Sequence, residues 1–120
     1  MTHPRTILVS RDDAMKRVAS AAVGQARRSS FESIECLDDI ADGNDLRDVA
    51  LFVIHLEAGG ELPDLSAFRS CLSRNGCNAA ILVVADEYRP ATALEAIRLG
   101  AVDYLPRPID QNELRFLVEM

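Results

Sequence analysis

The sequence lacks the features that would place it in a membrane, on nucleic acid or around a flavin. No apolar run approaches the roughly 20 residues that a membrane-spanning helix requires, and residues 1–5 are not followed by the apolar core of a signal peptide. Tryptophan is absent and aromatic residues make up 5%, which leaves little to stack on a flavin. A formal net charge of -6, with Arg27-Arg28 as a short basic pair, argues against a nucleic-acid surface.

The sequence has few cysteines and no phosphate-binding loop. Its three cysteines, Cys36, Cys71 and Cys77, are an odd number without metal-ligand spacing, so we expect small buried or half-buried thiols in the reducing cytoplasm rather than a zinc site. Gly59-Gly60 is not followed by the Lys-Ser or Lys-Thr of a phosphate cradle. We therefore expect no cofactor and no metal.

What remains is an ordinary globular composition, with 48% apolar and 27% charged residues in 120, which predicts one domain over residues 1–120. The predicted strands are Thr6–Ser10, Phe31–Cys36, Val49–Ile54, Ala79–Val84 and Tyr104–Leu105. Helical spacing of apolar residues separates the strands and also follows the fifth one. This alternation predicts an α/β fold: a doubly wound, five-stranded parallel sheet in a three-layer sandwich of flavodoxin type.

Several local patterns refine this fold. Val49–Ile54 is the most apolar run and predicts a central strand, whereas the alternation in Phe31–Cys36 predicts an edge strand. A polar stretch with a short helix is expected over Leu37–Asp48, and loops are expected to begin at His55 and Ala85. The helices are predicted to begin near Asp13, before Leu65, at Pro90 and after Asp110, with the third closed by Gly100. By spacing, the apolar residues Leu94, Ile97, Leu114 and Leu117 are expected to be mostly core.

Polar residues follow the predicted strands where ligands of open α/β sheets bind, at the carboxyl edge. They are Arg11-Asp12-Asp13, His55, Ala85-Asp86 and Arg107-Pro108. The segment from Gly100 to Asp110 resembles the end of a response-regulator receiver domain of two-component signalling. Residues 7–13 and the apolar strand before His55 resemble the same family, so the resemblance spans essentially the whole chain.

The resemblance assigns a chemical role to each position at this edge. In the family, an acidic pair binds Mg²⁺; Arg11 stands at its first position and Asp12 at its second. His55 stands where an aspartate accepts the phosphoryl group, Ala85 where a serine or threonine lies, and Arg107 where a lysine contacts the phosphate. Four of these five positions have changed.

Each change removes part of the family's chemistry. His55 forms no acyl phosphate and is a poor ligand for a hard cation. Arg11 is expected to occupy the metal's space and to pair with Asp12 or Asp13. Ala85 has no hydroxyl group and leaves room for an inward ring at Tyr104, which matches the family's mobile aromatic residue.

These residues predict a degenerate receiver domain that is not an enzyme. The resemblance implies the amino-terminal module of a longer regulator, and the uncapped apolar end at Met120 suggests the same. The module would control an effector, such as a transcription factor or an ATPase, with a sensor kinase as a further partner. Homodimerisation is expected through Ala91–Leu99, Tyr104–Leu105 and Gln111–Val118.

Other readings of the same residues stay open at this point. His55 is either a hydrogen-bonded neutral imidazole without a task or a pH-sensitive group, and Asp12 and Asp13 are either helix-start carboxylates or the remnant of a metal pocket. A working receiver would use Asp12, Asp13 or Asp86 as its acceptor. A flavodoxin-like ligand-binding protein or enzyme is the other class, although Ser10 and the cysteines have no obvious partner base in the sequence.

Overall fold

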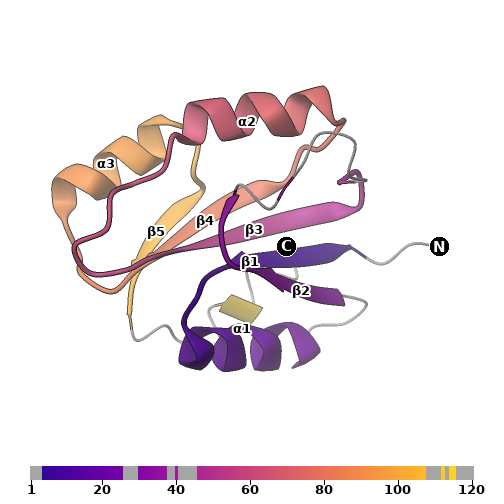
Figure 1. Cartoon of the computed structure of the whole chain (residues 1–120), viewed down its shortest axis with the longest axis horizontal. Helices are drawn as coiled ribbons and strands as arrows, with labels where there is room; N and C mark the ends of the chain where they lie inside the picture. The colour runs from indigo at the N-terminus through magenta and orange to yellow at the C-terminus, as the bar shows by residue number, and fades with distance from the viewer. Residues whose placement is uncertain are drawn as a thin grey trace.

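The computed structural model describes residues 4–25, 30–37, 40, 46–107, 112 and 114–115. Strands and helices alternate along these residues (Figure 1). The elements are β1 (Arg5–Val9), α1 (Asp13–Gln25), β2 (Ser30–Ile34), β3 (Val49–Leu56), α2 (Leu65–Arg74), β4 (Ala80–Ala85), α3 (Pro90–Arg98) and β5 (Asp103–Pro106). Asn112, Leu114 and Arg115 also have helical backbone.

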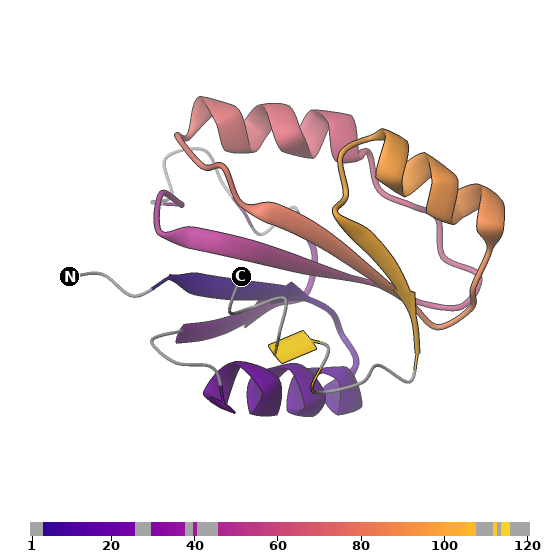
Figure 2. The same ribbon diagram turned by 180° about the vertical axis from the view of Figure 1, so that it is seen from behind.

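The five strands form one parallel sheet in the order β2-β1-β3-β4-β5. Helix α1 covers one face of this sheet, and α2 and α3 cover the other (Figures 1 and 2). The predicted α/β fold with a doubly wound five-stranded parallel sheet is therefore confirmed. The chain passes from β1 to β2 on one side of β1 and then crosses to β3 on the other side. The switch point, where ligands of such sheets commonly bind, therefore lies between β1 and β3.

The core consists of an apolar cluster on each face of the sheet. On the α2 side, the rings of Phe52 and Phe68 pack edge to face with centroids 5.0 Å apart. On the α1 side, Leu8, Met15 and Val53 are all completely buried. Central strands are covered on both faces in this way, which explains why the segments around residues 49–56 and 80–85 read as continuous apolar runs.

Strand β2 is the edge strand that the alternation in its sequence predicts. Among the described strands it pairs with β1 alone, and its residues are exposed or half-buried throughout. A polar side chain alternating with an apolar one suits this position, because one face of an edge strand meets solvent. The observed strand covers Ser30–Ile34, so Glu35 and Cys36 of the expected strand follow it as a bend.

The helices begin and end near the expected residues. The Oδ1 atom of Asp12 accepts the Met15 N–H at 3.1 Å at the start of α1, and Asp64 accepts the Ala67 N–H at 3.0 Å at the start of α2. Helix α3 begins at Pro90, which needs no hydrogen-bond partner for its nitrogen in the first turn. Gly100 has φ 109°, a backbone conformation that a side chain would strain.

Two expectations from the sequence are corrected, and two others fall outside the described residues. His55 and Ala85 lie inside β3 and β4 rather than in loops, because each is still paired with the neighbouring strand. Leu94 is 71% exposed and Ile97 is 46% exposed, so neither belongs to the core; Ala96 is the fully buried residue of α3. Leu114 is buried, whereas Leu117 lies outside the described residues, as does most of the segment expected to hold a short helix.

No helix among the described residues is long and apolar enough to cross a bilayer. Cys36 and Cys71 are half-buried, Cys77 is buried, and none of these three described residues forms a disulfide bond. Within the described ranges, no three His, Cys, Asp or Glu side chains are arranged to hold a metal ion.

Candidate functional site

The residues expected to form the site converge at the carboxyl edge of the sheet. A chain of side-chain hydrogen bonds links five residues there, in the order Ser10, His55, Asp86, Arg107 and Asp12. We call these five the carboxyl-edge network. Backbone hydrogen bonds fix their strands, since the Asp86 N–H binds the Leu56 carbonyl and the Arg107 N–H binds the Ala85 carbonyl, each within 3.0 Å.

Arg107 is the cation of this network. Its Nη1 atom lies 2.8 Å from Asp12 Oδ2 and 3.0 Å from Asp86 Oδ1. The three side chains are only 24–30% exposed, and charge-assisted bonds of this length are strong ones. One guanidinium thus joins the loop after β1 to the loop after β4 and lies between their two carboxylates.

The titration of these groups follows from the pairing. The hydrogen bond from Arg107, followed by that from the Met15 N–H, lowers the pKa of Asp12 from 3.8 to about 2. Burial raises the pKa of Asp86, but the hydrogen bonds from His55 and Arg107 together lower it by more than burial raises it, so the net shift is downward. Asp12 and then Asp86 raise the pKa of Arg107. All three groups are therefore ionised at neutral pH.

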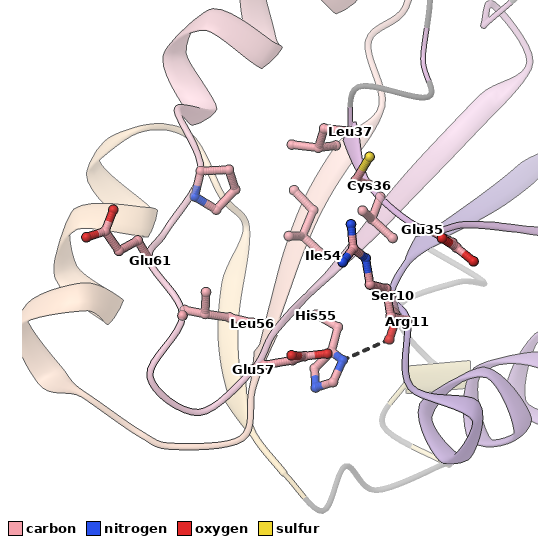
Figure 3. A pocket seen from close by; sticks show the side chains of 13 residues that line it. Ser10, Arg11, Glu35, Cys36, Leu37, Ile54, His55, Leu56, Glu57 and Glu61 are labelled. Atoms are coloured by element: carbon pink, nitrogen blue, oxygen red, sulfur yellow. Dashed lines mark hydrogen bonds between the residues drawn. The ribbon is translucent and has the colours of Figure 1, made fainter.

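The expectation that Arg11 neutralises the acidic pair is wrong. Among the described residues Arg11 has no ion pair; it is exposed and lines a pocket beside Glu35 and Cys36 (Figure 3). Arg107 takes the role instead, because it extends from the end of β5 between the two carboxylates. The sequence placed two arginines near this edge, and only side-chain packing distinguishes them.

Asp12 and Asp13 have different environments. Asp12 caps α1 with one carboxylate oxygen and binds Arg107 with the other, so the helix-start reading and the pocket reading both apply to it. The Asp13 side chain is 84% exposed and lies 3.9 Å from Lys16, in the first turn of the helix. Asp13 is therefore a helix-start carboxylate and not part of the network.

His55 is bonded at both ring nitrogens, and its side chain is fully shielded from solvent. Nδ1 lies 2.8 Å from Ser10 Oγ, and Nε2 lies 2.8 Å from Asp86 Oδ1. Because the Asp86 carboxylate only accepts, Nε2 carries the proton, and the Ser10 hydroxyl donates to Nδ1. The reading of His55 as a hydrogen-bonded neutral imidazole fits this arrangement.

One member of the network was missed from the sequence. Asp86 is among the residues expected at this edge, whereas the sequence shows no obvious partner base for Ser10. The strand register contains the missing signal: Val9 pairs with Ile54, so the next residues along, Ser10 and His55, are neighbours. Asp86 follows β4 by one residue in the same way.

Ala85 and Tyr104 lie on the two strands beside the network. Ala85 is 1% exposed and Tyr104 is 5% exposed, so the ring is turned inward. Its hydroxyl donates to the Glu87 carbonyl at 3.4 Å, and its ring meets that of Tyr88 edge to face at 5.6 Å. Pro108, expected to flank Arg107 rigidly, lies outside the described residues.

A pocket of about 410 Å³ opens beside the network, between the ends of β1, β2 and β3 and the loop before α2. Ser10 and His55 form part of its lining (Figure 3). Apolar side chains supply much of the rest: Val9, Leu37, Ile54, Leu56 and Pro63. Arg11, Glu35, Glu57 and Glu61 are its charged residues.

Comparison with solved structures identifies the architecture. The chain superposes on a response regulator CheY-like protein from Mesorhizobium loti with a TM-score of 0.72 at 20% identity, covering 97% of this chain and 96% of that one. It superposes on the beryllofluoride-activated NtrC4 receiver domain dimer with a TM-score of 0.74 at 16% identity, covering 96% and 93%. The fold is that of a response-regulator receiver domain.

Comparison of amino-acid sequences finds relatives of the same kind at low identity. The chain is 26% identical over 122 residues to the two-component response regulator-like PRR73 of Oryza sativa, in both the indica and the japonica subspecies. The match covers 94% of this chain but 15% of the rice proteins. No protein-family model matches the chain.

Proposed function

We propose that the chain is a receiver-type signalling module that works without aspartyl phosphorylation and controls an effector through protein–protein contacts. The observation that carries this proposal is the bridge from Arg107 to Asp12 and Asp86 at 2.8 and 3.0 Å. It supplies permanently the positive charge that Mg²⁺ would supply in a phosphorylation reaction.

The remaining groups support the same conclusion. One oxygen of Asp12 caps α1 and the other binds Arg107, so neither is spare for a hard cation that needs several oxygen ligands. His55 offers no carboxylate oxygen to a phosphoryl group, and both of its nitrogens are already bonded. Ala85 provides no hydroxyl group that would respond to a phosphate.

The output surface that fits this proposal lies on and beside α3. Leu94 and Ile97, three residues apart on the helix, are exposed, and so are Tyr88 and Val102 at 54% each. We call these four residues the α3 apolar patch. With Tyr104 held inward beneath it, the patch is available without a phosphorylation signal. An effector domain, in the same protein or another one in the cytoplasm, or a second copy of this chain, is the partner we assign to it.

The test combines acetyl phosphate with Mg²⁺ and measures the intact mass of the protein. We expect no labile phosphoryl adduct, while a conventional receiver domain treated in parallel is labelled. A labile adduct on Asp12, Asp13 or Asp86 would overturn the proposal and support a working receiver with a different acceptor.

A further inference from the structure

Ser10, His55 and Asp86 form a continuous relay of hydrogen bonds that phosphorylation does not use. The Ser10 hydroxyl lies 2.8 Å from one nitrogen of the imidazole, and the Asp86 carboxylate lies 2.8 Å from the other. A serine in contact with an imidazole that a carboxylate orients is the arrangement that turns a hydroxyl group into a nucleophile. Here the ring is used with Nδ1 toward the serine and Nε2 toward the carboxylate.

We propose that Ser10 is a nucleophilic serine that accepts an acyl group from a small activated ester or thioester, with His55 as its general base. The relay is independent of the proposed signalling function, because it requires neither a partner protein nor the α3 apolar patch. It assigns a covalent modification site to the carboxyl-edge network.

The surrounding charges favour proton transfer to His55. Asp12 and Asp86 carry two negative charges and Arg107 carries one positive charge, so the group has a net charge of about -1 when the imidazole is neutral. A proton taken from Ser10 brings the group to neutrality. The His55 side chain is fully shielded from solvent, so this internal compensation is what makes an imidazolium acceptable there.

The position of the Ser10 hydroxyl is also fixed. The Asp12 N–H donates to Oγ at 3.0 Å, which holds the oxygen between the start of α1 and the imidazole. Positive potential at the amino end of a helix stabilises negative charge that develops on such an oxygen. The residue is 3% exposed overall, and the pocket that it lines is the route that we assign to the acyl donor.

That pocket defines the class of donor. A volume of about 410 Å³ lies within the usual range for small-molecule sites. The apolar walls, which include Val9, Ile54 and Leu56, suit a short hydrocarbon chain. Arg11 is the cationic residue of the lining, and Glu35, Glu57 and Glu61 are its acidic residues (Figure 3), so the net charge of the lining suits an uncharged donor.

The step balances without any oxidant or reductant. Ser10 Oγ forms a bond to the carbonyl carbon of the donor while its proton moves to His55 Nδ1. The bond from that carbon to the leaving oxygen or sulfur then breaks, and His55 returns the proton to the leaving group. The products are acyl-Ser10 and a free alcohol or thiol. Acylated Ser10 no longer donates to His55, so the link between the ends of β1 and β3 is lost.

p-Nitrophenyl acetate is the probe for this site in the intact chain. We expect release of about one nitrophenolate per protein, one added acetyl group in the intact mass, and peptide mapping that places it on Ser10. Ser10→Ala abolishes the adduct, whereas Ser73→Ala, which changes an exposed serine of α2, leaves it unchanged. Ser10→Cys, which keeps a nucleophile in place, is still acetylated.

The role of the base is tested separately. His55→Gln should slow acetylation by about 100-fold or more, the usual contribution of a general base. Asp86→Asn, which replaces the carboxylate that accepts from His55 Nε2, should also slow acetylation. Acetylation only at Lys16 or elsewhere, no adduct on the native chain, or an unchanged rate in folded His55→Gln would each overturn the proposal.

Discussion

The carboxyl-edge network and the α3 apolar patch differ in whether their side chains have partners within the protein. In the network, the side chain of His55 on β3 and the polar side chains that follow β1, β4 and β5 bind one another, and the His55 side chain is shielded completely. On the patch, Leu94 and Ile97 remain in solvent although they sit on a helix that packs on the sheet. The polar groups at the carboxyl edge of the sheet are bonded to one another, whereas the apolar side chains of the α3 apolar patch are left uncovered.

Under the function proposed above, this contrast separates the region that would contact a partner from the network at the carboxyl edge of the sheet. Arg107 pairs with the two carboxylates of Asp12 and Asp86 inside the chain, and the proposal is that this pairing replaces the response to a metal ion and a phosphate. Covering exposed apolar side chains with a partner lowers the free energy by roughly 25 cal/mol for each Å² removed from water. The two regions can therefore be altered independently, and each of the following experiments changes one without the other.

The largest effect is expected from His55→Phe, which keeps a ring of similar size but removes both hydrogen bonds. Ser10 and Asp86 each lose a partner, and a buried polar group without one costs about 1–3 kcal/mol. We expect the free energy of unfolding to fall by about 2 kcal/mol or more in urea titrations. Ser73→Ala serves as the control, and an unchanged midpoint in His55→Phe would show that the network does not stabilise the fold.

Arg107→Met should create sensitivity to Mg²⁺. It leaves the Asp12 and Asp86 carboxylates close together without a cation, so a divalent ion can replace the guanidinium. Thermal unfolding of this variant should move up by about 4 °C or more when MgCl₂ is added, while the native protein does not shift. Arg98→Met, which removes an exposed arginine paired with Glu95, is the matched control; equal shifts in both variants would contradict the account.

Acid should weaken the network through Asp12. Its pKa is lowered from 3.8 to about 2, chiefly by the hydrogen bond from Arg107. The unfolded chain binds this proton more readily than the folded chain, so the stabilisation is complete above about pH 4 and is lost as the pH falls through about 2. Urea titrations across this range should show a shallower decline for Arg107→Met than for the native protein. If stability falls equally with pH in both proteins, Arg107 is not the cause of the lowered pKa of Asp12.

The smallest effect on folding is expected from Leu94→Ser combined with Ile97→Ser. Both side chains are largely exposed, so the free energy of unfolding should change by about 0.5 kcal/mol per site or less. Self-association of the isolated chain, measured by sedimentation, should nevertheless be lost or weakened. The same is expected for binding to an effector domain where one follows in the protein. Self-association and effector binding that persist at native strength in this variant would exclude the α3 apolar patch as the interface.

The fold was readable from the sequence because its signals are local. Continuous apolar runs specified the central strands, the alternation around Phe31 specified the edge strand, and Pro90 and Gly100 marked the ends of α3 closely. Spacing along α3 failed for Leu94 and Ile97, because this short helix buries only Ala96 completely and leaves its larger apolar residues outside. A periodic pattern identifies an apolar face but not whether another element covers it.

The site was readable only in part. The resemblance brought His55, Asp12, Ala85 and Arg107 to one edge of the sheet, and the structure places them there. Which arginine would pair with Asp12 depended on side-chain direction, which sequence spacing does not contain. The contact between Ser10 and His55 depended on the register between β1 and β3, and a change of one residue in that register would have separated them.

The most direct measurement of the central claim is a titration of the native chain with Mg²⁺ and beryllofluoride, followed by backbone amide NMR shifts. Because Arg107 already occupies the charge-neutralising position, the amides of Asp12, His55, Asp86 and Arg107 should not move together at saturable ligand concentrations. Saturable shifts of all four, requiring both Mg²⁺ and beryllofluoride, would contradict the claim that this network has replaced the phosphorylation site.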